Sequence, residues 1–468
     1  MSNNSSSSDI KGEQIEAPAK KMVFYSFGNI VSTFFITAYS TLIFYFYEVE
    51  VGLPVLLVSL ALILFAIFNM ISVPLLGYLT DRPTKWTKKY GFRTPWIIIS
   101  AFPALIFYLF LFTPPNVDVK TNPWPIFWYM VLFSCLYNAF YSIYRMHYYG
   151  GFANIFRGES ERKKANMINW LVASPFTILL TVLPYIFIVY GDRSTFVLTA
   201  LISISIMLVC NILTIPGVTE SDEIKNRYIQ GFGVDKGSYR ELLGITFRSK
   251  NFMVSLCSFA GWIIALGIST ASTIYFFKDV LQVPLQQAII PSLVMYLAMM
   301  ISMPILSRFS RNHDYTTIYL IGIILSLITY IPLLWITTIE ELIVVFIIRG
   351  IATSCCVLMM MPMVSDVYDE ITLACGRHQE ATLQSFRTII YRSSPLFEAL
   401  VIGLIHIATN YDPSPNAVQS PLAVWGVRVH TALIPILLLI MSIIMILFYD
   451  LKGDKKTTLK ENLRKRGL

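Results

Sequence analysis

The sequence predicts an all-α membrane protein in which twelve transmembrane helices form two six-helix halves. Three observations lead to this prediction: charged residues are scarce, twelve apolar runs are long enough to cross a bilayer, and basic residues are sorted by loop. Charged residues make up 14% of the 468 positions, against about 25% in a soluble globular protein. A bilayer core of roughly 30 Å needs about 20 predominantly apolar residues per helix.

Twelve apolar runs of this length follow one another along the chain. Several contain Pro or Gly, which transmembrane helices tolerate. The predicted spans are 23–49, 55–79, 95–113, 124–148, 166–190, 195–215, 252–277, 284–307, 315–337, 341–364, 384–409 and 422–449. The longest internal polar stretch separates spans six and seven, so it divides the chain into two halves.

This division defines five parts of the chain. The two bundles are predicted at 23–215 and 251–449, joined by a cytoplasmic linker at 216–250. Residues 1–22 are polar and are therefore expected to be a disordered cytoplasmic N-terminus. No apolar segment among them resembles a cleavable signal peptide. Residues 450–468 form a basic tail, also expected in the cytoplasm.

Basic residues gather in alternate loops. If the N-terminus lies inside, the outer segments hold only Lys120, Arg193 and Lys278 among basic residues. The same outer segments hold the acids Glu48, Glu50, Asp118, Asp192, Asp279, Glu340, Glu341 and Asp412. This sorting follows the positive-inside rule, so we expect a multi-pass protein of the cell membrane with both termini cytoplasmic. It also explains the net charge of +8 without a nucleic-acid partner.

Polar side chains within the apolar runs are the candidate functional residues. An ionisable group at the centre of a membrane helix costs about 2.5–3.5 kcal/mol on insertion scales, and a buried amide needs a partner. Hydrogen bonding between helices and contact with a substrate are both open for the amides Asn29, Asn69, Asn138 and Asn169. The same alternatives are open for Arg392, which lies about two turns beyond an inner loop. Tyr141 is either a packing residue or a platform for a sugar ring.

The sequence favours neither catalysis nor metal binding. The six cysteines form no CxxC pair. The five histidines are scattered, and no nucleophile–base pattern, HExxH motif or phosphate-binding loop is present. We therefore expect no enzyme activity and no cofactor.

Three stretches, in order along the chain, resemble one transporter family. Span two ends in GYLTDR and continues into PTKWTKKYGFRTPW, residues 158–166 read GESERKKAN, and residues 366–392 read DVYDEITLACGRHQEATLQSFRTIIYR. The last stretch carries the acids, the Gly-x-Arg-x-Glu segment and the Arg-Thr pair of the family pattern. Together they resemble the glycoside–pentoside–hexuronide:cation symporter family, with melibiose permease as a member, within the major facilitator superfamily.

The resemblance implies a secondary transporter that moves a sugar, a glycoside or a related polar metabolite by alternating access. We expect the partners to be a small-molecule substrate, a sugar or glycoside first, and the lipid bilayer, and we expect a monomer. Substrate-binding positions of the family fall on Asn29, Asn138 and Asn169. Arg392, which stands at a basic position of the family, and Tyr141 are added as substrate-binding candidates from the residues themselves. The cytoplasmic gate is expected to consist of Asp81, Arg82, Glu161, Arg162, Asp366, Arg377, Glu380 and Arg387.

The departures from the family pattern concern ion coupling. Asn69 and Val73 stand where the family has two cation-binding acids in span two, and Thr388 stands at a cation-site threonine. Hard cations need charged oxygen ligands, so the loss of both acids should weaken a Na⁺ site severely. Co-transport of H⁺ or Na⁺ and uncoupled transport both stay open. Because the nearby acids are gone, Arg392 is an uncompensated positive charge that would favour an anionic substrate.

Two other interpretations stay open at this point. One is a carrier of lysolipids or organic anions, in which Arg392 binds the charged group. The other is a sensor that keeps the fold and does not transport, which the missing acids favour slightly.

Overall fold

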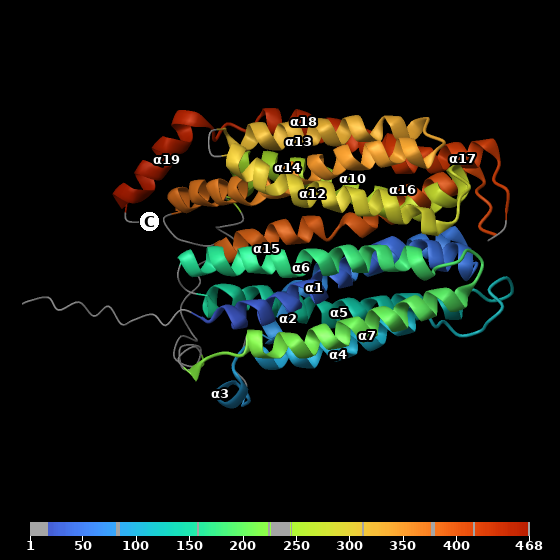
Figure 1. Ribbon diagram of the computed structural model, residues 1–468, viewed down its shortest axis with the longest axis horizontal. Helices are drawn as coiled ribbons and strands as arrows, with labels where there is room; N and C mark the ends of the chain where they lie inside the picture. Colours follow the sequence, from blue (N-terminus) through green and yellow to red (C-terminus); the bar gives the residue numbers. More distant parts are fainter. Residues whose placement is uncertain are drawn as a thin grey trace, which may run out of the picture.

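The protein is helical in every regular element that the computed structural model describes, namely within residues 17–80, 85–156, 159–222, 225, 244, 246–310, 313–375, 380–414 and 417–466. Its helices lie side by side in two layers, one from each half of the chain (Figure 1). The N-terminal half consists of α1 (Ala19–Tyr45), the π-helical η1 (Phe46–Glu50), α2 (Val55–Thr80), α3 (Thr87–Tyr90), α4 (Thr94–Leu111), α5 (Trp124–Ile155), α6 (Glu159–Phe187) and α7 (Arg193–Val218).

The C-terminal half is interrupted more often, by short π-helical and 3₁₀ segments. It consists of α10 (Lys250–Ala271), α11 (Thr273–Tyr275), η2 (Phe276–Val280), η3 (Leu285–Ala288), α12 (Ile289–Phe309), α13 (Tyr315–Tyr330), η4 (Pro332–Leu334), α14 (Ile339–Cys375), α15 (Glu380–Tyr391), α16 (Ser394–Thr409), α17 (Pro421–Arg428), η5 (Val429–Leu433), α18 (Ile434–Leu447) and α19 (Gly453–Arg466).

Ten of the twelve predicted spans are confirmed as helices long and apolar enough to cross a membrane, counted over the described residues. The other two predicted spans are helical but are not among these ten. The first, 23–49, lies in α1 and η1, and the eleventh, 384–409, is divided between α15 and α16. The count of twelve spans therefore stays a prediction, while the all-α membrane fold is confirmed.

The break between α15 and α16 follows from the local sequence Ser393-Ser394-Pro395. Proline has no backbone N–H, and its ring disfavours the helical conformation of the residue before it. The backbone N–H of Ser393 accordingly bonds to the Ile390 carbonyl at 3.1 Å, one residue short of the α-helical partner. Pro395 then occupies the first turn of α16, where a missing donor costs little. Arg392 lies in this break.

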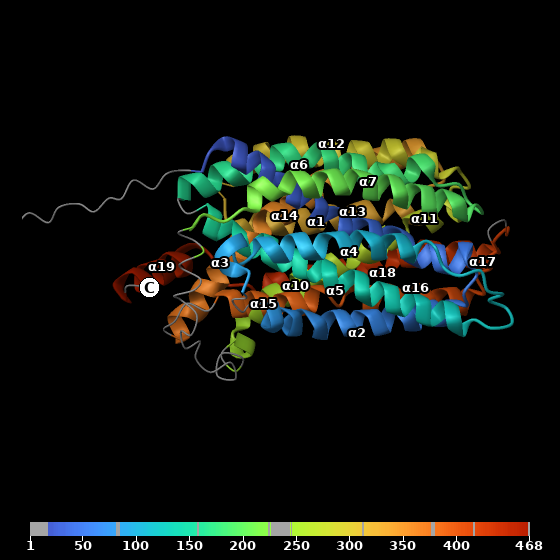
Figure 2. The ribbon, with the colours of Figure 1, turned by 90° about the horizontal axis from the view of Figure 1, so that it is seen from below.

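Helices of each half pack mainly on one another. In the N-terminal half α1 packs on α6 and α7, while α5 packs on α2 and α4; in the C-terminal half α14 packs on α12 and α13, and α10 packs on α18. The halves meet chiefly where α16 packs on α2 and where α12 packs on α6. Figure 2 shows α16 running beside α2, on which it packs. Gly403 permits the close approach of α16, because a methyl group there would overlap Ser59 of α2.

The two ends of the molecule differ in charge. We call the end that carries α3 and α19 the basic end and the end that carries α17 the acidic end (Figure 1). The predicted basic tail forms α19, which packs on α14 through an ion pair of 2.6 Å between Lys456 Nζ and Asp366 Oδ2. Glu220 joins α7 to the start of α4 near the basic end by accepting hydrogen bonds from the backbone N–H groups of Phe92 and Arg93. Burial raises the pKa of Glu220 even though these donors favour its charged form.

A substitution at Gly217 tests the packing of α7 on α1. A methyl group at this position would overlap the backbone of Phe24 and Tyr25, and overpacking of this kind costs about 1–3 kcal/mol. We expect Gly217→Ala to lower the melting temperature of the detergent-solubilised protein by several degrees. Gly151→Ala is the matched control, because its methyl would meet its nearest neighbour at 3.5 Å, an ordinary contact. Equal melting temperatures for the two variants would contradict the packing described here.

Candidate functional site

A network of polar side chains joins the two halves near the middle of the long helices. Arg392 Nη1 donates to Asn69 Oδ1 at 2.6 Å and to Ser142 Oγ at 2.9 Å. Asn138 Nδ2 donates to the same Asn69 oxygen at 3.1 Å. Asn69 and Asn138 are buried, with 7% and 4% of their surface exposed. The Asn69 amide therefore accepts two hydrogen bonds and links α2, α5 and the α15–α16 break.

The break determines where the Arg392 guanidinium lies. A side chain in a broken helix belongs to neither flanking helix face, so it can reach across to the opposite half. Transporters often place substrate sites at such interrupted membrane helices. Arg392 Nε is buried and has no hydrogen-bond partner among the described residues. The guanidinium thus keeps a free donor beside the two that hold it in place.

A second arginine, Arg145, lies on the face of α5 that carries Asn138 and Ser142. Asn138, Ser142, Arg145 and Tyr149 follow one another at spacings of four, three and four residues, which places them on one face of a helix. The Arg145 guanidinium lies 5.6 Å from the centre of the Tyr149 ring. The Tyr149 hydroxyl donates to Asn29 Oδ1 at 2.9 Å. This face of α5 therefore connects Asn29 of α1 with Arg392.

The site has a positive electrostatic character. Arg145 and Arg392 are close enough for their like charges to act on each other, and Tyr141 lies near both. Within the described part of the chain, no ion pair joins either guanidinium to a carboxylate. The carboxylate of Glu398, the nearest acid along the helix, accepts from Ser394 Oγ at 2.8 Å instead. The arrangement can therefore bind an anion without displacing an acid.

Three of the predicted site residues, Tyr141, Asn169 and Thr388, are not hydrogen-bonded to this network. The Tyr141 hydroxyl is buried and has no hydrogen-bond partner among the described residues. Thr388 Oγ1 donates to the Gln384 carbonyl of its own helix at 2.8 Å. Asn169 Oδ1 is buried and has no hydrogen-bond partner among the described residues. The role of Thr388 in cation coupling and that of Asn169 in substrate binding stay predictions. The structure instead bonds Asn69, the other predicted cation-site residue, to Arg392.

The predicted gate residues fall into two groups. Asp81, Arg82 and Arg377 lie outside the described residues, as does the side chain of Glu380. Asp366 pairs with Lys456, and Arg387 donates to the hydroxyls of Tyr368 and Tyr391, all within the C-terminal half.

The two gate residues of the N-terminal half that the structure describes, Glu161 and Arg162, lie near its basic end. Glu161 Oε1 accepts from the backbone N–H of Ala17 at 2.7 Å. Arg162 Nε donates to the Phe156 carbonyl at 2.8 Å. A gating role for these residues remains a prediction.

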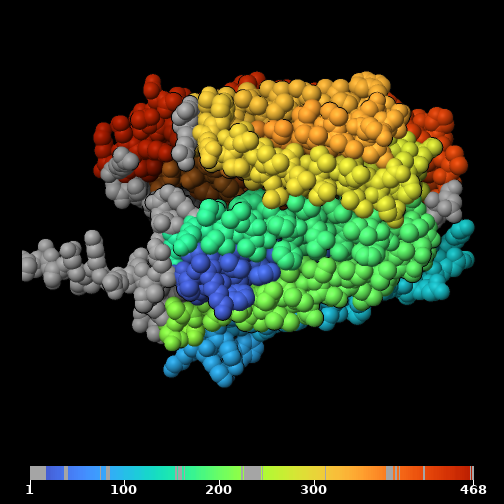
Figure 3. Space-filling view, viewed as in Figure 1, coloured from blue at the N-terminus to red at the C-terminus, as the bar shows by residue number. Residues whose placement is uncertain are grey.

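The two ends of the molecule differ in how the halves meet. Figure 3 shows a recess at the basic end, between α12 and α6. Toward the acidic end, Ser59 Oγ of α2 donates to the Ala399 carbonyl at 3.1 Å, and Gln286 Nε2 donates to the Ile188 carbonyl at 3.2 Å. These bonds cross from one half to the other, so the acidic end is closed.

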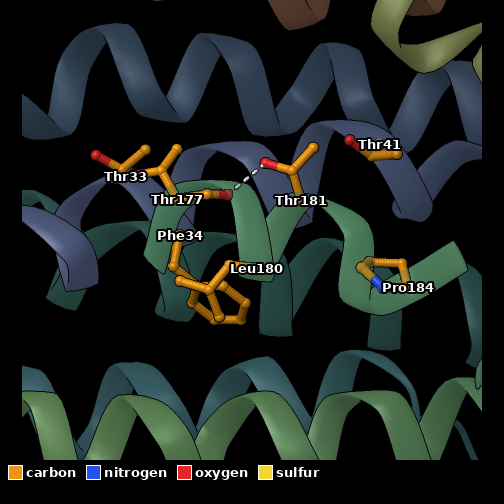
Figure 4. Close-up of a pocket in the computed structure, with 7 residues that line it drawn as sticks. All are labelled: Thr33, Phe34, Thr41, Thr177, Leu180, Thr181 and Pro184. Atoms are coloured by element: carbon orange, nitrogen blue, oxygen red, sulfur yellow. Dashed lines mark hydrogen bonds between the residues drawn. The ribbon is translucent and has the colours of Figure 1, made fainter. Parts of the chain in front are cut away.

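A separate small pocket lies beside α1 and α6 (Figure 4). Its lining includes Thr177 and Thr181, whose hydroxyls donate to carbonyls of their own helix. Thr181 Oγ1 also lies 3.4 Å from the Tyr296 hydroxyl of α12. No charged side chain lines this pocket, so we place the candidate site at Arg392 and Arg145 instead.

Comparison with known proteins identifies the class of this chain. The family of MFS/sugar transport proteins matches residues 24–453. The chain belongs to this family. The family is an MFS transporter family, so the resemblance read from the three sequence stretches is confirmed. An uncharacterised symporter of Synechocystis sp. is 21% identical, and the match covers 91% of this chain and 92% of that protein.

Solved structures confirm the fold. The nucleoside transporter NupG superposes with a TM-score of 0.61 at 13% identity, covering 93% of this chain and all of the other. A bacterial homologue of the human lysosomal transporter Spinster gives 0.59 at 13% identity, covering 96% and 97%. The peptide transporter POT gives 0.60 at 12% identity, covering 95% of each chain. At these identities the likeness concerns the fold alone.

Two residues of the site, Ser142 and Arg145, are not among those predicted from the sequence. The spacing of Asn138, Ser142, Arg145 and Tyr149 in the sequence predicts that they share one face of a helix.

Replacing Asn69 tests its position between Arg392 and Asn138. Losing a hydrogen bond to a charged group costs about 1.5–3 kcal/mol, so we expect Asn69→Ala to lower the melting temperature in detergent. Asn69→Asp keeps the oxygen acceptor and adds a charge opposite to that of Arg392, so it should melt at or above the native temperature. If both variants lose the same stability, the bond to Arg392 does not hold the centre together.

Proposed function

We propose that the protein is a secondary transporter that carries a small polar metabolite with an anionic group, such as a uronide or a sugar phosphate, by alternating access. The observation that carries this proposal is the pair Arg392 and Arg145, which have no carboxylate partner among the described residues. Family membership supports a transporter of this general kind.

The site offers donors suited to such a ligand. A guanidinium binds carboxylate or phosphate through paired N–H groups, and the Nε of Arg392 has no other partner in the described chain. The amides of Asn69 and Asn138 and the hydroxyl of Ser142 surround it and can hydrogen-bond sugar hydroxyls. We further propose that the ring of Tyr141, which is packed beside Phe35 and Tyr137 near both arginines, contacts the sugar ring of the bound ligand.

The bond between Arg392 and Asn69 gives this site a part in alternating access. It joins the C-terminal half to the N-terminal half at 2.6 Å. An anionic ligand competes with Asn69 for the guanidinium, because both are acceptors. Binding of the ligand would thus weaken one contact between the halves and replace it with the ligand's own contacts to both.

The site argues against Na⁺ coupling through α2. Asn69 and Val73 offer no charged oxygen, and Asn69 Oδ1 already accepts two hydrogen bonds. A cation placed there would also lie beside the positive Arg392. We therefore propose that α2 does not hold the coupling ion of this carrier.

Uptake into proteoliposomes of the pure protein tests the proposed substrate class. The panel consists of neutral sugars, uronides, sugar phosphates and lysolipids, each with and without Na⁺ and pH gradients. We expect saturable uptake of an anionic member. The lysolipids are included because the same arginines would bind a lipid phosphate. Saturable uptake of neutral sugars alone would contradict the proposal.

The variant Arg392→Gln tests whether this guanidinium binds the transported anion. A hydrogen bond to a charged group is worth about 1.5–3 kcal/mol, so we expect the KM for the anion to rise about tenfold or more. Arg308→Gln, at the exposed end of α12, is the matched control and should behave as the native protein. If Arg392→Gln also behaves as the native protein, the anion binds elsewhere.

A further inference from the structure

A cluster of titratable side chains is buried at the acidic end, where it joins the two halves. Glu48 belongs to η1 of the N-terminal half, whereas His406 of α16 and His430 of η5 belong to the other. At most 2% of the surface of each of the three is exposed. Neither the family comparison nor the anion site accounts for three ionisable groups enclosed together.

Hydrogen bonds connect the cluster in a row. His406 Nδ1 lies 2.8 Å from Glu48 Oε1, and the Tyr275 hydroxyl donates to Glu48 Oε2. His406 Nε2 lies 3.3 Å from His430 Nε2, and His430 Nδ1 lies 2.7 Å from Ser272 Oγ. The row therefore runs from the carboxylate through two imidazoles to one hydroxyl.

Every hydrogen bond in this row can form in two protonation states, which differ by one bound proton. In the first, His406 is neutral and donates from Nδ1 to Glu48, while its Nε2 accepts from His430. The Nδ1 of His430 then accepts from the Ser272 hydroxyl. In the second, His406 carries protons on both nitrogens, and His430 donates from Nδ1 to Ser272. The Ser272 hydroxyl then turns to the Ile268 carbonyl, 2.7 Å away. One added proton thus needs no movement of a heavy atom.

We infer that the Glu48–His406–His430 cluster is a proton-binding site whose occupancy holds the acidic end of the carrier closed. Imidazole is the side chain whose charge ordinarily changes between about pH 5 and 8. The added proton makes the His406 imidazole positive, and its Nδ1 lies 2.8 Å from the Glu48 carboxylate. Opening of the acidic end would separate these opposite charges. The closed form therefore binds the proton more tightly, and by linkage the proton favours the closed form.

The other titratable groups around the cluster differ in their partners, and the hydroxyls of Tyr45 and Tyr190 have no hydrogen-bond partner among the described residues. Asp279 accepts from the Tyr411 hydroxyl at 2.7 Å and lies 3.5 Å from Lys278, all in the C-terminal half. The Tyr411 ring stacks on His406 at 4.1 Å. The groups on the surrounding elements are Tyr45 of α1, Glu50 of η1, Tyr275 of α11, Tyr190 and Arg193. Among the contacts described between the halves, the one from His406 to Glu48 brings an imidazole to a carboxylate.

The Glu48–His406–His430 cluster supplies a proton-binding group, which α2 lacks. Asn69 and Val73 can carry no proton, whereas the cluster at the acidic end can take one and respond to it by closing. The inference rests on the proposed function, because it assumes that the acidic end opens during transport. Its test must therefore report on the opening itself rather than on uptake.

The test measures how fast a cysteine at the closed interface reacts with a water-soluble maleimide. Ser59→Cys places the thiol where α2 meets α16, in a chain whose six native cysteines are replaced by serine. Ser414→Cys, on an exposed loop of the same end, corrects for the effect of pH on thiol reactivity. We expect the ratio of the two rates to rise about tenfold or more from pH 5.5 to 8.

Two variants in this labelling background assign the response to the cluster. His406→Gln keeps a donor for Glu48 but takes no proton, so its rate ratio should stay constant with pH. Glu48→Gln keeps the acceptor for Tyr275 and provides the same test if the first variant does not fold. His313→Gln, an exposed histidine at the basic end, should respond as the native chain does. A native ratio that does not change with pH would overturn the inference, as would a pH response preserved in His406→Gln.

The labelling and the uptake experiments test the two proposals independently, so one proposal can be contradicted while the other is supported. A pH-dependent labelling ratio without uptake of any solute in the panel would retain the proton site and overturn the proposed function. Uptake together with a constant labelling ratio would retain the carrier and overturn the proton site.

Discussion

The hydrogen bond between Arg392 Nη1 and Asn69 Oδ1 is the contact on which the centre of this molecule depends. A guanidinium inside a membrane protein is stable only when its donors find acceptors. Here an amide and a hydroxyl supply them, and no carboxylate does so among the described residues. The positive charge is therefore solvated by the protein without being neutralised. This difference makes the centre receptive to an anion.

Polar groups occupy the centre and the acidic end in different ways. At the centre, the amide of Asn69 and the hydroxyl of Ser142 accept from Arg392, whose Nε has no hydrogen-bond partner among the described residues. At the acidic end, Glu48 is bonded on both oxygens by residues of the opposite half. The first arrangement is the one in which we propose a substrate site, and the second joins the two halves at the acidic end. The recess at the basic end agrees with this division, because a carrier closed at one end opens at the other (Figure 3).

Several predicted residues occur where the sequence placed them, yet with partners that the sequence did not reveal. Asn29, Asn138, Tyr141 and Arg392 gather around α5, whereas the Thr388 hydroxyl, among the described residues, bonds only to its own helix. The linear pattern shows which side chains are polar within apolar runs. It does not show the direction of each side chain, because a change of one residue rotates a helix face by about 100°.

The sequence by itself determined the membrane fold, ten of its spans and the family, because apolar length and loop charge are properties of a linear chain. It also determined that α2 carries no acid. The tertiary structure decided that Asn69 faces Arg392, since Pro395 interrupts the helix and frees Arg392 to cross between the halves. It likewise decided that Glu48, His406 and His430 meet, although 358 positions separate the first two. Such contacts depend on how whole helices pack, which no local pattern records.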